Sequence, residues 1–322
     1  MALRIIGRYH TIQPCAQGQD QQVLETVRKL DADGEPFFTK RALQHIYSQI
    51  CPQLPKVKQI SVVGLNNHPM TWNVETGSII HSHDPRYPTV VEDDDEIVLP
   101  EDPEKPSFTT ILKTHELHMG KPCIGYYPFQ RMVEENERAA GAHDIELMFH
   151  PLRIEHDTGL RRLGTNDFHQ PFQPRPYAEV QRSFLAVQQA WNASKSCEQL
   201  TTILRRELRR GVNKIVAFDL CSLSVEKSEV AQYQHAMLAT LQQHFGVECF
   251  AQDSSYLSED RRLLASQNIK MIPDPEGWLK LDDNSVLVTH LPNMPVKAIT
   301  VDIARPAVII WNKSPRVWHH YK

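Results

Sequence analysis

A regular alternation of short apolar runs and helical patterns begins at Lys214 and continues to Trp311. In chain order the apolar runs are "KIVAF", "VECFA", "IKMI", "SVLVTH" and "AVIIW". Helical patterns lie between most of them, and Ser258 is placed to cap the helix that follows "VECFA". Short apolar strands that alternate with helices indicate a parallel sheet covered by helices. The sequence therefore predicts an α/β fold with a Rossmann-like parallel sheet of about five strands flanked by helices.

The first 157 residues show no such regularity. Helical and strand patterns are mixed there: helices are expected at 21–30 and 39–50, the latter capped by Thr39, and strands at 59–65, 78–83 and 144–154. This mixture predicts an α+β N-terminal part, either a separate domain or an extension of the same sheet.

Gly, Pro, Asn and Asp are frequent in the segment 158–177, which is typical of an extended connection. The predicted organisation is therefore an N-terminal α+β region at 1–157, a linker at 158–177 and a Rossmann-like domain at 178–322.

Charge and composition exclude several classes of protein. The net charge is −4, and the one short basic cluster, 205–210, is expected on the exposed face of a helix, so we expect no nucleic-acid partner. No window holds the ~18 apolar residues of a membrane span, and the first ten residues are too polar for a secretory signal. The six cysteines are scattered without a C-x-x-C pair. This predicts reduced thiols in a cytoplasmic protein, with the nucleus left open.

Several blocks in the second half resemble one known family in their order. They are "KIVAFDLCSLS", "YQHAMLATL", "CFAQDSSYLSEDRRLL" and "IPDPEGWLKLDDNSVLVTHLPNMPVKAITVDIARPAVIIWNK", with "EPFFTKRALQHI" further upstream. The chain resembles the SRR1-like family, named for a plant protein of red-light sensitivity, and its fungal branch in particular. The resemblance implies an SRR1-like domain and a link to circadian, stress or haem-related regulation, without a defined reaction. Relatives usually carry Gly-Ser where this chain has Cys221-Ser222, and cysteine adopts a positive φ less readily than glycine.

Polar residues follow the ends of the expected parallel strands, where open sheets of this kind bind ligands. As catalytic candidates we name Asp219, His235 and His290, and as substrate-binding candidates Ser222, Ser224, Asp253, Tyr256 and Asn293. Either histidine could carry a proton near neutral pH, and Asp219 or Asp253 could orient a substrate or act as a base. The alternatives are that Asp219 only caps a helix, that His290 belongs to a plain turn and that His235 is a core residue.

No cofactor is predicted. Asp253 stands where dinucleotide-binding domains keep an acid for the ribose, but no G-x-G-x-x-G follows the first strand, and Asp219 would repel a pyrophosphate. We therefore do not expect NAD. A metal is a weaker alternative, for which His81 and His83 would share a strand face and His115 and His118 a helical face.

Three functions remain open from the sequence. The first is a protein that binds a small polar metabolite at the strand ends, as a cofactor-independent enzyme of fungal secondary metabolism. The second is a non-enzymatic regulatory or scaffold protein whose acidic loop, Glu92–Glu96, or linker contacts a protein partner. The third is a metal-dependent enzyme that uses the N-terminal histidines. The sequence names neither a reaction nor an oligomeric state.

Overall fold

The structure is a computed structural model, and it describes most of the chain. The described residues are 4–6, 9–11, 20–50, 57–80, 115–138, 145–162, 168–169, 174–207, 211–225, 229–290, 292 and 294–312. The chain divides into two compact units. The N-terminal unit consists of 1–27, 48–127 and 131–171, and the C-terminal unit of 28–47, 128–130 and 172–322. The domain limits predicted from the sequence, 1–157, 158–177 and 178–322, remain a prediction.

A five-stranded parallel sheet forms the centre of the C-terminal unit, as the sequence predicts. Its strands are β9 (Lys214–Phe218), β10 (Glu248–Gln252), β11 (Ile269–Met271), β12 (Ser285–Thr289) and β13 (Val308–Ile310). They lie in the order β11-β10-β9-β12-β13, and each neighbouring pair is parallel. The three central strands are buried along nearly their whole length, which explains their unbroken apolar sequences.

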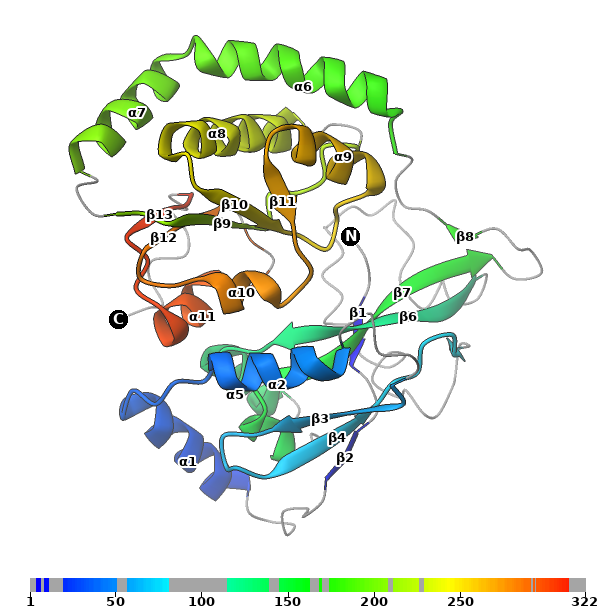
Figure 1. The fold of residues 1–322 in the computed structure, drawn as a ribbon. Coiled ribbons are helices and arrows are strands. Elements are labelled where there is room, and N and C mark those ends of the chain that lie inside the picture. The colour runs from blue at the N-terminus through cyan, green and yellow to red at the C-terminus, as the bar shows by residue number, and fades with distance from the viewer. Residues whose placement is uncertain are drawn as a thin grey trace. The chain divides into compact units, whose positions relative to one another are not determined.

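Helices cover both faces of this sheet (Figure 1). They are α6 (Tyr177–Asn192), α7 (Lys195–Glu207), α8 (Glu229–Phe245), α9 (Ser258–Ser266), α10 (Glu276–Lys280) and α11 (Val296–Ile303). Figure 1 shows α8 and α9 on one face, with α6 outside them, and α10 and α11 on the other face. Alternate strand residues, such as Ala217 and Val288, join the core formed with α6, α8 and α9. The opposite face is represented by Phe218, whose ring stacks on Trp278 of α10 with centroids 3.8 Å apart.

Two helices lie between strands β2 (Tyr9–Thr11) and β3 (Gln59–Val63) in the chain. Helix α1 spans Asp20–Ala32 and α2 spans Lys40–Ile50. Thr39 caps α2 as predicted, because its hydroxyl accepts the backbone N–H of Ala42 at 3.1 Å. Ser258 does not cap α9: it is the first helical residue, and the N-cap is Leu257.

The N-terminal unit is built on antiparallel strands. One sheet has the order β1-β7-β6-β5, with β8 also paired to β7, and a second sheet has the order β2-β4-β3. The strands are β1 (Arg4–Ile6), β2 (Tyr9–Thr11), β3 (Gln59–Val63), β4 (Pro69–Asn73), β5 (Ile79–Ile80), β6 (His115–Tyr126), β7 (Leu152–Arg162) and β8 (Phe168–His169). Helix α5 spans Phe129–Arg138, and the 3₁₀ helix η1 spans Ile145–Phe149.

Two sequence expectations for this unit are wrong. The segment 144–154 is not all strand, because Leu147, Met148 and Phe149 are buried in succession within η1, and a strand would alternate them. His115 and His118 do not share a helical face, because both belong to strand β6.

None of the helices in the described part of the chain has the length and apolar character needed to cross a membrane.

Candidate functional site

The parallel sheet has a topological switch point beside its first strand. The chain runs from β9 outward through β10 to β11 and then returns to the other side of β9 as β12. The carboxyl ends of β9 and β12 therefore send their connections in opposite directions, which is where open parallel sheets bind ligands. The loop after β9 and the residues that follow Thr289 border this point.

The loop after β9, Asp219–Ser224, has an unusual backbone, and we call it the β9 loop. Asp219 has φ 52° and Cys221 has φ 64°, both in the left-handed region. Residues other than glycine rarely adopt this region, and such positions concentrate at functional sites. The chain thus keeps at Cys221 a conformation that suits glycine, although it carries a cysteine there.

Backbone hydrogen bonds tie the start of the β9 loop to the end of β10. The N–H of Asp219 donates to the carbonyl of Gln252 at 3.1 Å, and the N–H of Cys221 donates to Oδ2 of Asp253 at 2.7 Å. The other oxygen of Asp253, Oδ1, accepts both the N–H and the hydroxyl of Ser255. Asp253 therefore joins two loops through both of its carboxylate oxygens.

Asp260 of α9 anchors the second half of the β9 loop. Its carboxylate is fully buried and accepts the hydroxyls of Ser222 and Ser224, each at 2.7 Å. It also accepts the backbone N–H of Leu223 at 2.9 Å and that of Leu257 at 2.7 Å. Four donors on one buried carboxylate fix the loop against the start of α9. Ser222 and Ser224 are themselves buried, so they hold the loop in place through Asp260.

Arg175 holds the same loop from another segment. Its backbone N–H donates to the carbonyl of Ser224, and its Nη2 donates to the carbonyl of Leu223, both at 2.9 Å. The anchors at Asp260 and Arg175 come from the two sides of the β9 loop in sequence. The strained backbone at Asp219 and Cys221 is thus followed by a firmly bonded segment.

The fully buried His235 and the partly buried Tyr256 form a hydrogen-bonded pair. The Nδ1 atom of His235 lies 2.7 Å from the carbonyl of Ala231, and Nε2 lies 2.7 Å from the hydroxyl of Tyr256. A carbonyl can only accept, so Nδ1 carries the proton and Nε2 accepts from Tyr256. Burial lowers the pKa of His235 and raises the pKa of Tyr256 well above its ordinary value. The pair is therefore neutral at physiological pH.

Cys221 is exposed but is not an activated thiol. Partial burial, followed by the charges of Asp253 and Asp219, raises the pKa of Cys221. A thiol whose pKa is raised is mostly protonated at neutral pH and is a poor nucleophile.

The end of β12 supplies the other border of the switch point. Thr289 is 3% exposed, and its hydroxyl has no hydrogen-bond partner among the described residues. His290 follows it and is half-buried. The backbone N–H of Met294 donates to Oδ2 of Asp219 at 3.3 Å, which links the connection after β12 to the β9 loop. Asn293 lies outside the described residues.

A row of polar contacts continues along the carboxyl edge beyond β10. Nε2 of Gln252 donates to Asp274 at 2.8 Å, and Oε1 of Gln252 accepts the N–H of Gly277 at 2.7 Å. The hydroxyl of Tyr47 donates to the carboxylate of Glu276. A side chain at Gly277 would collide with the Phe218 ring and with Gln252, since an added Cβ would lie 2.6 Å from that ring. Glycine at this position allows α10 to approach the sheet closely.

The structure brings six of the candidates together around the β9 loop and its supports. They are Asp219, Ser222, Ser224, His235, Asp253 and Tyr256. Sequence reasoning missed Asp260 and Arg175 as members of the site. The only signal for Asp260 was its position in the first turn of a helix, where a simple electrostatic role explained it.

The N-terminal histidines do not form a described metal site. His81 and His83 lie outside the described residues, and Nε2 of His118 lies 3.3 Å from Glu116. Among the described residues, no group of three or more His, Cys, Asp and Glu side chains is arranged to hold a metal ion.

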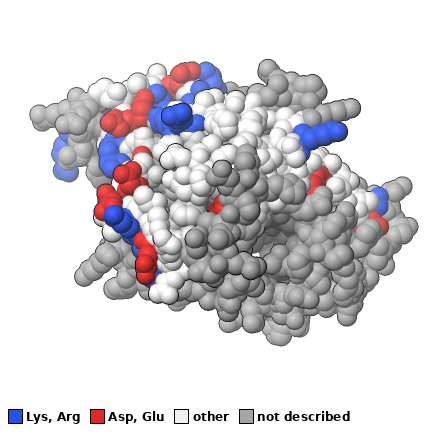
Figure 2. Space-filling view, turned by 90° about the horizontal axis from the view of Figure 1, so that it is seen from below, with Lys and Arg blue, Asp and Glu red and all other residues white. Residues whose placement is uncertain are grey.

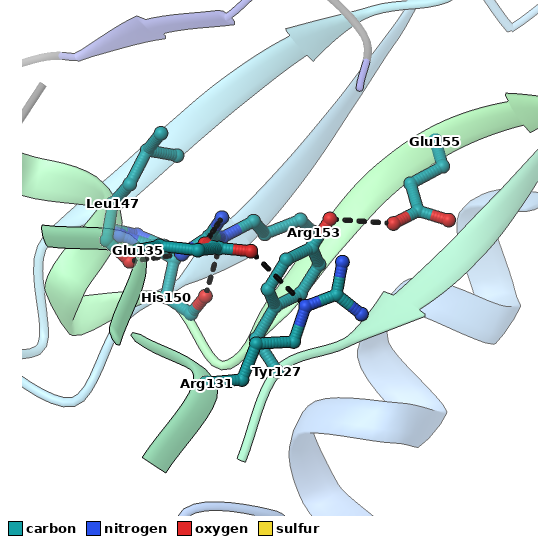
Figure 3. Close-up of polar contacts among 7 residues, drawn as sticks. All are labelled: Tyr127, Arg131, Glu135, Leu147, His150, Arg153 and Glu155. Carbon is teal, nitrogen blue, oxygen red and sulfur yellow. Dashed lines mark hydrogen bonds and ion pairs between the residues drawn. The ribbon is translucent and has the colours of Figure 1, made fainter. Parts of the chain in front are cut away.

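A second polar network, which the sequence did not indicate, lies in the N-terminal unit around Tyr127 (Figure 3). Arg153 and Arg131 lie over the Tyr127 ring, with their guanidinium carbons 3.8 Å and 4.2 Å from its centroid. The Tyr127 hydroxyl donates to Glu155 at 2.7 Å, and Glu135 pairs with both arginines. We call these five residues the Tyr127 cluster. Its charges neutralise one another, which is typical of a structural network.

The charges of the described surface are mixed on the face seen in Figure 2. Lys and Arg side chains stand beside Asp and Glu side chains there. Such a mixture offers a nucleic-acid backbone no continuous basic track on the described part of that face.

Comparison with known families identifies a known domain in the part of the chain that forms the parallel sheet. Residues 192–321 match the model of the SRR1 domain. The chain matches no curated protein and no solved structure. It therefore contains an SRR1-like domain over these residues, which include the whole parallel sheet and the β9 loop.

Proposed function

We propose that the SRR1-like domain binds a small polar metabolite at the carboxyl ends of β9 and β12. The observation that carries this proposal is the β9 loop at the topological switch point. Two residues other than glycine hold left-handed backbone there, and Asp253, Asp260 and Arg175 fix the loop around them. A loop that is both strained and firmly anchored at this place in the fold is typical of a pre-organised ligand site.

The proposed contacts to the ligand come from the two borders of the switch point. Asp219 and His290 are the side chains that we assign to the ligand, with Asn293 as a third. Ser222 and Ser224 are assigned to the support of the loop, because both are buried and donate to Asp260, and Asp253 is assigned to it because it accepts from Cys221 and Ser255. Asp219 is itself 7% exposed and its Oδ2 accepts the N–H of Met294, and we assign it to the ligand for its charge at the switch point. The carboxylate of Asp219 favours a ligand that donates hydrogen bonds or carries positive charge.

We propose that the ligand is not a dinucleotide. The backbone N–H groups of Asp219, Cys221 and Leu223 already donate to protein acceptors, so they are not offered to a phosphate. Both oxygens of Asp253 are also bonded within the protein, where a dinucleotide site would use the acid for a ribose.

If the bound metabolite reacts, we propose that His290 carries the proton. His290 is half-buried and so can be reached by a ligand, whereas both ring nitrogens of His235 have protein partners. His235 and Tyr256 would then hold the connection between β10 and α9 in place without contacting the ligand. This is cofactor-independent acid–base chemistry.

The test is native mass spectrometry of the untagged protein, compared with its denatured mass. The proposal expects a retained organic mass in the wild type that is lost in Asp219→Asn. Asparagine tolerates left-handed backbone, so this change removes the charge and preserves the fold. Glu248→Gln is the matched control, because Glu248 is an exposed acid at the start of β10 whose loss also removes one charge.

Two results would count against the proposal. One is a ligand that stays bound equally well in Asp219→Asn and in the control, which would place it elsewhere. The other is a wild-type protein that binds no member of a metabolite library, amines included, in a thermal-shift screen. His290→Ala separates binding from chemistry, because it should keep the ligand and abolish its turnover.

A further inference from the structure

The face of the C-terminal unit that carries α10 and α11 is bound by a segment from far upstream in the chain. Residues 28–47 belong to this unit, although the SRR1 match begins only at residue 192. We infer that residues 37–47 are a built-in partner of the α10–α11 face, and that the working SRR1-like domain includes them. This inference does not depend on the proposed metabolite.

The first contact is made by Asp302 at the end of α11. Its Oδ2 atom accepts two successive backbone N–H groups, those of Phe37 and Phe38, each at 2.9 Å. Phe38 is 1% exposed and Phe37 is 8% exposed, so these amides have little access to water. A buried N–H without a partner is costly. We therefore expect Asp302 to stabilise the packing of the residues just before α2 against α11.

The second and third contacts lie along α2. Nζ of Lys40 donates to the carbonyl of Leu281, just after α10, and the Tyr47 hydroxyl donates to Glu276, at the start of α10. Partial burial lowers the pKa of Lys40. The contacts at Lys40 and Tyr47 bracket α10 at both ends, so α2 lies along it.

These contacts define what the α10–α11 face recognises. Asp302 binds the main-chain N–H groups that lie just before α2. The two ends of α10 bind one cationic side chain, Lys40, and one hydroxyl side chain, Tyr47, which lie seven residues apart. Tyr47 also reaches the residue next to Gly277, whose N–H bonds to Gln252 at the carboxyl edge. Through α10, the upstream segment is thereby connected to the carboxyl edge of the parallel sheet.

Amide-resolved hydrogen exchange on the full chain tests the inference. In the wild type we expect the Phe37 and Phe38 amides to exchange at least tenfold more slowly than in an unstructured peptide. Asp302→Ala should accelerate both by about tenfold or more, because it removes their acceptor. Asp302→Asn should change them by less than about threefold, since the amide oxygen can still accept both bonds.

Asp283→Ala is the matched control. Asp283 also accepts a backbone N–H in this unit, that of Arg305, at 2.7 Å. Its loss should leave Phe37 and Phe38 unchanged. Tyr47→Phe removes only a hydroxyl and should accelerate the amides of Gly277 and Trp278 several-fold while the protein stays folded.

The outcomes separate clearly. Unprotected Phe37 and Phe38 amides in the wild type would overturn the inference without any variant. Equal effects of Asp302→Ala and Asp283→Ala would overturn it too, because they would show only general destabilisation. If Asp302→Ala does not fold, the two milder variants still test the inference. A tenfold loss of Phe37 protection in Asp302→Asn would contradict it, and so would unchanged exchange of the α10 amides in Tyr47→Phe.

Discussion

Two polar networks among the described residues, the Tyr127 cluster and the anchored β9 loop, are built in different ways. In the Tyr127 cluster, two arginines lie over one aromatic ring and both pair with Glu135, while Glu155 accepts the ring hydroxyl. In the β9 loop, the buried carboxylate of Asp260 accepts only hydroxyls and backbone N–H groups, and two residues nearby hold left-handed backbone. The first network closes on itself, whereas the second fixes a strained loop at a strand end.

This difference separates stability from binding. A closed network of paired charges can specify how sheets and helices pack, and it leaves nothing for a ligand. An anchored loop keeps an unfavourable backbone in place, and that arrangement persists only where surrounding bonds enforce it. We therefore expect substitutions in the Tyr127 cluster to change stability alone, and substitutions around the β9 loop to change ligand retention as well.

The largest expected effect is that of Arg153→Met. Arg153 is 2% exposed and donates to Glu135, to the carbonyl of His150 and to that of Leu147. Its loss removes one donor from the Glu135 carboxylate, which keeps Arg131, and one from each of the two carbonyls, at a cost of about 3–5 kcal/mol in the free energy of unfolding. Urea unfolding followed by exchange of amides in β6 and β7 measures this cost for the N-terminal unit.

Arg131→Met is the matched control for that prediction. The Arg131 side chain is 54% exposed and makes an i,i+4 pair with Glu135, so its loss should cost only about 0.5–1 kcal/mol. A cost below about 1 kcal/mol for both variants would show that the Tyr127 cluster does not stabilise the unit.

Mild acid should distinguish the two units next. Burial lowers the pKa of His150 and of His156 in the N-terminal unit, and of His235 in the C-terminal unit. Each stays neutral when folded but takes up a proton on unfolding below its ordinary pKa of about 6.5, so stability falls as pH falls. Burial raises the pKa of Asp302 in the C-terminal unit, which acts in the opposite direction.

From pH 6.5 to 5.5 the N-terminal unit should therefore lose up to about 2 kcal/mol, and the C-terminal unit about half of that or less. Exchange of slow amides in β7 and β9, measured at constant temperature across this range and corrected for intrinsic rates, gives both slopes. Equal slopes in the two units would contradict the assignment of two titrating histidines to the first.

Asp260→Asn is expected to cost about 2 kcal/mol, because an amide NH₂ must then face donors that the carboxylate now accepts. The same variant should lose the retained ligand, since the β9 loop would no longer be held. Ser258→Ala, at an exposed residue two positions earlier, should change stability by less than ~0.5 kcal/mol and keep the ligand. Native mass spectrometry and urea unfolding of both variants measure the two effects. Ligand retention in Asp260→Asn at wild-type level would separate the loop from the site.

The parallel sheet could be predicted because its central strands are mostly apolar and alternate with helices along the chain, which indicates parallel pairing. The order of the strands was not predicted. The N-terminal unit could not. Strand β6 carries Gly120 and Pro122 at an irregularity of its pairing with β7, and its polar start breaks any alternation. Antiparallel partners such as β1 and β7 are also more than a hundred residues apart, and nothing local in the sequence joins them.

The same limit applies to the site. Asp219 and Asp253 could be found because they directly follow strands, and a strand end is a place defined by local pattern. Asp260 and Arg175 support the β9 loop from a helix and from an upstream segment. Their roles exist only in three dimensions, and each has an ordinary local explanation as a helix-end charge or a surface arginine.

The smallest expected effect concerns Cys221, and it tests whether the left-handed backbone of the β9 loop is strained. Glycine adopts a φ of 64° without the clash that a Cβ brings, so Cys221→Gly should raise the free energy of unfolding by about 0.5–1 kcal/mol. Cys221→Ala keeps the Cβ and should leave stability within ~0.5 kcal/mol of the wild type. Urea unfolding of the wild type and of both variants measures the difference in stability, and native mass spectrometry reports whether the ligand is retained.

A gain in stability with the ligand retained would mean that the thiol is not part of the site, and that Gly-Ser and Cys-Ser serve the same loop. A loss of stability in Cys221→Gly would show that the β9 loop is not left-handed at this residue, and the argument from strain to a ligand site would fall with it.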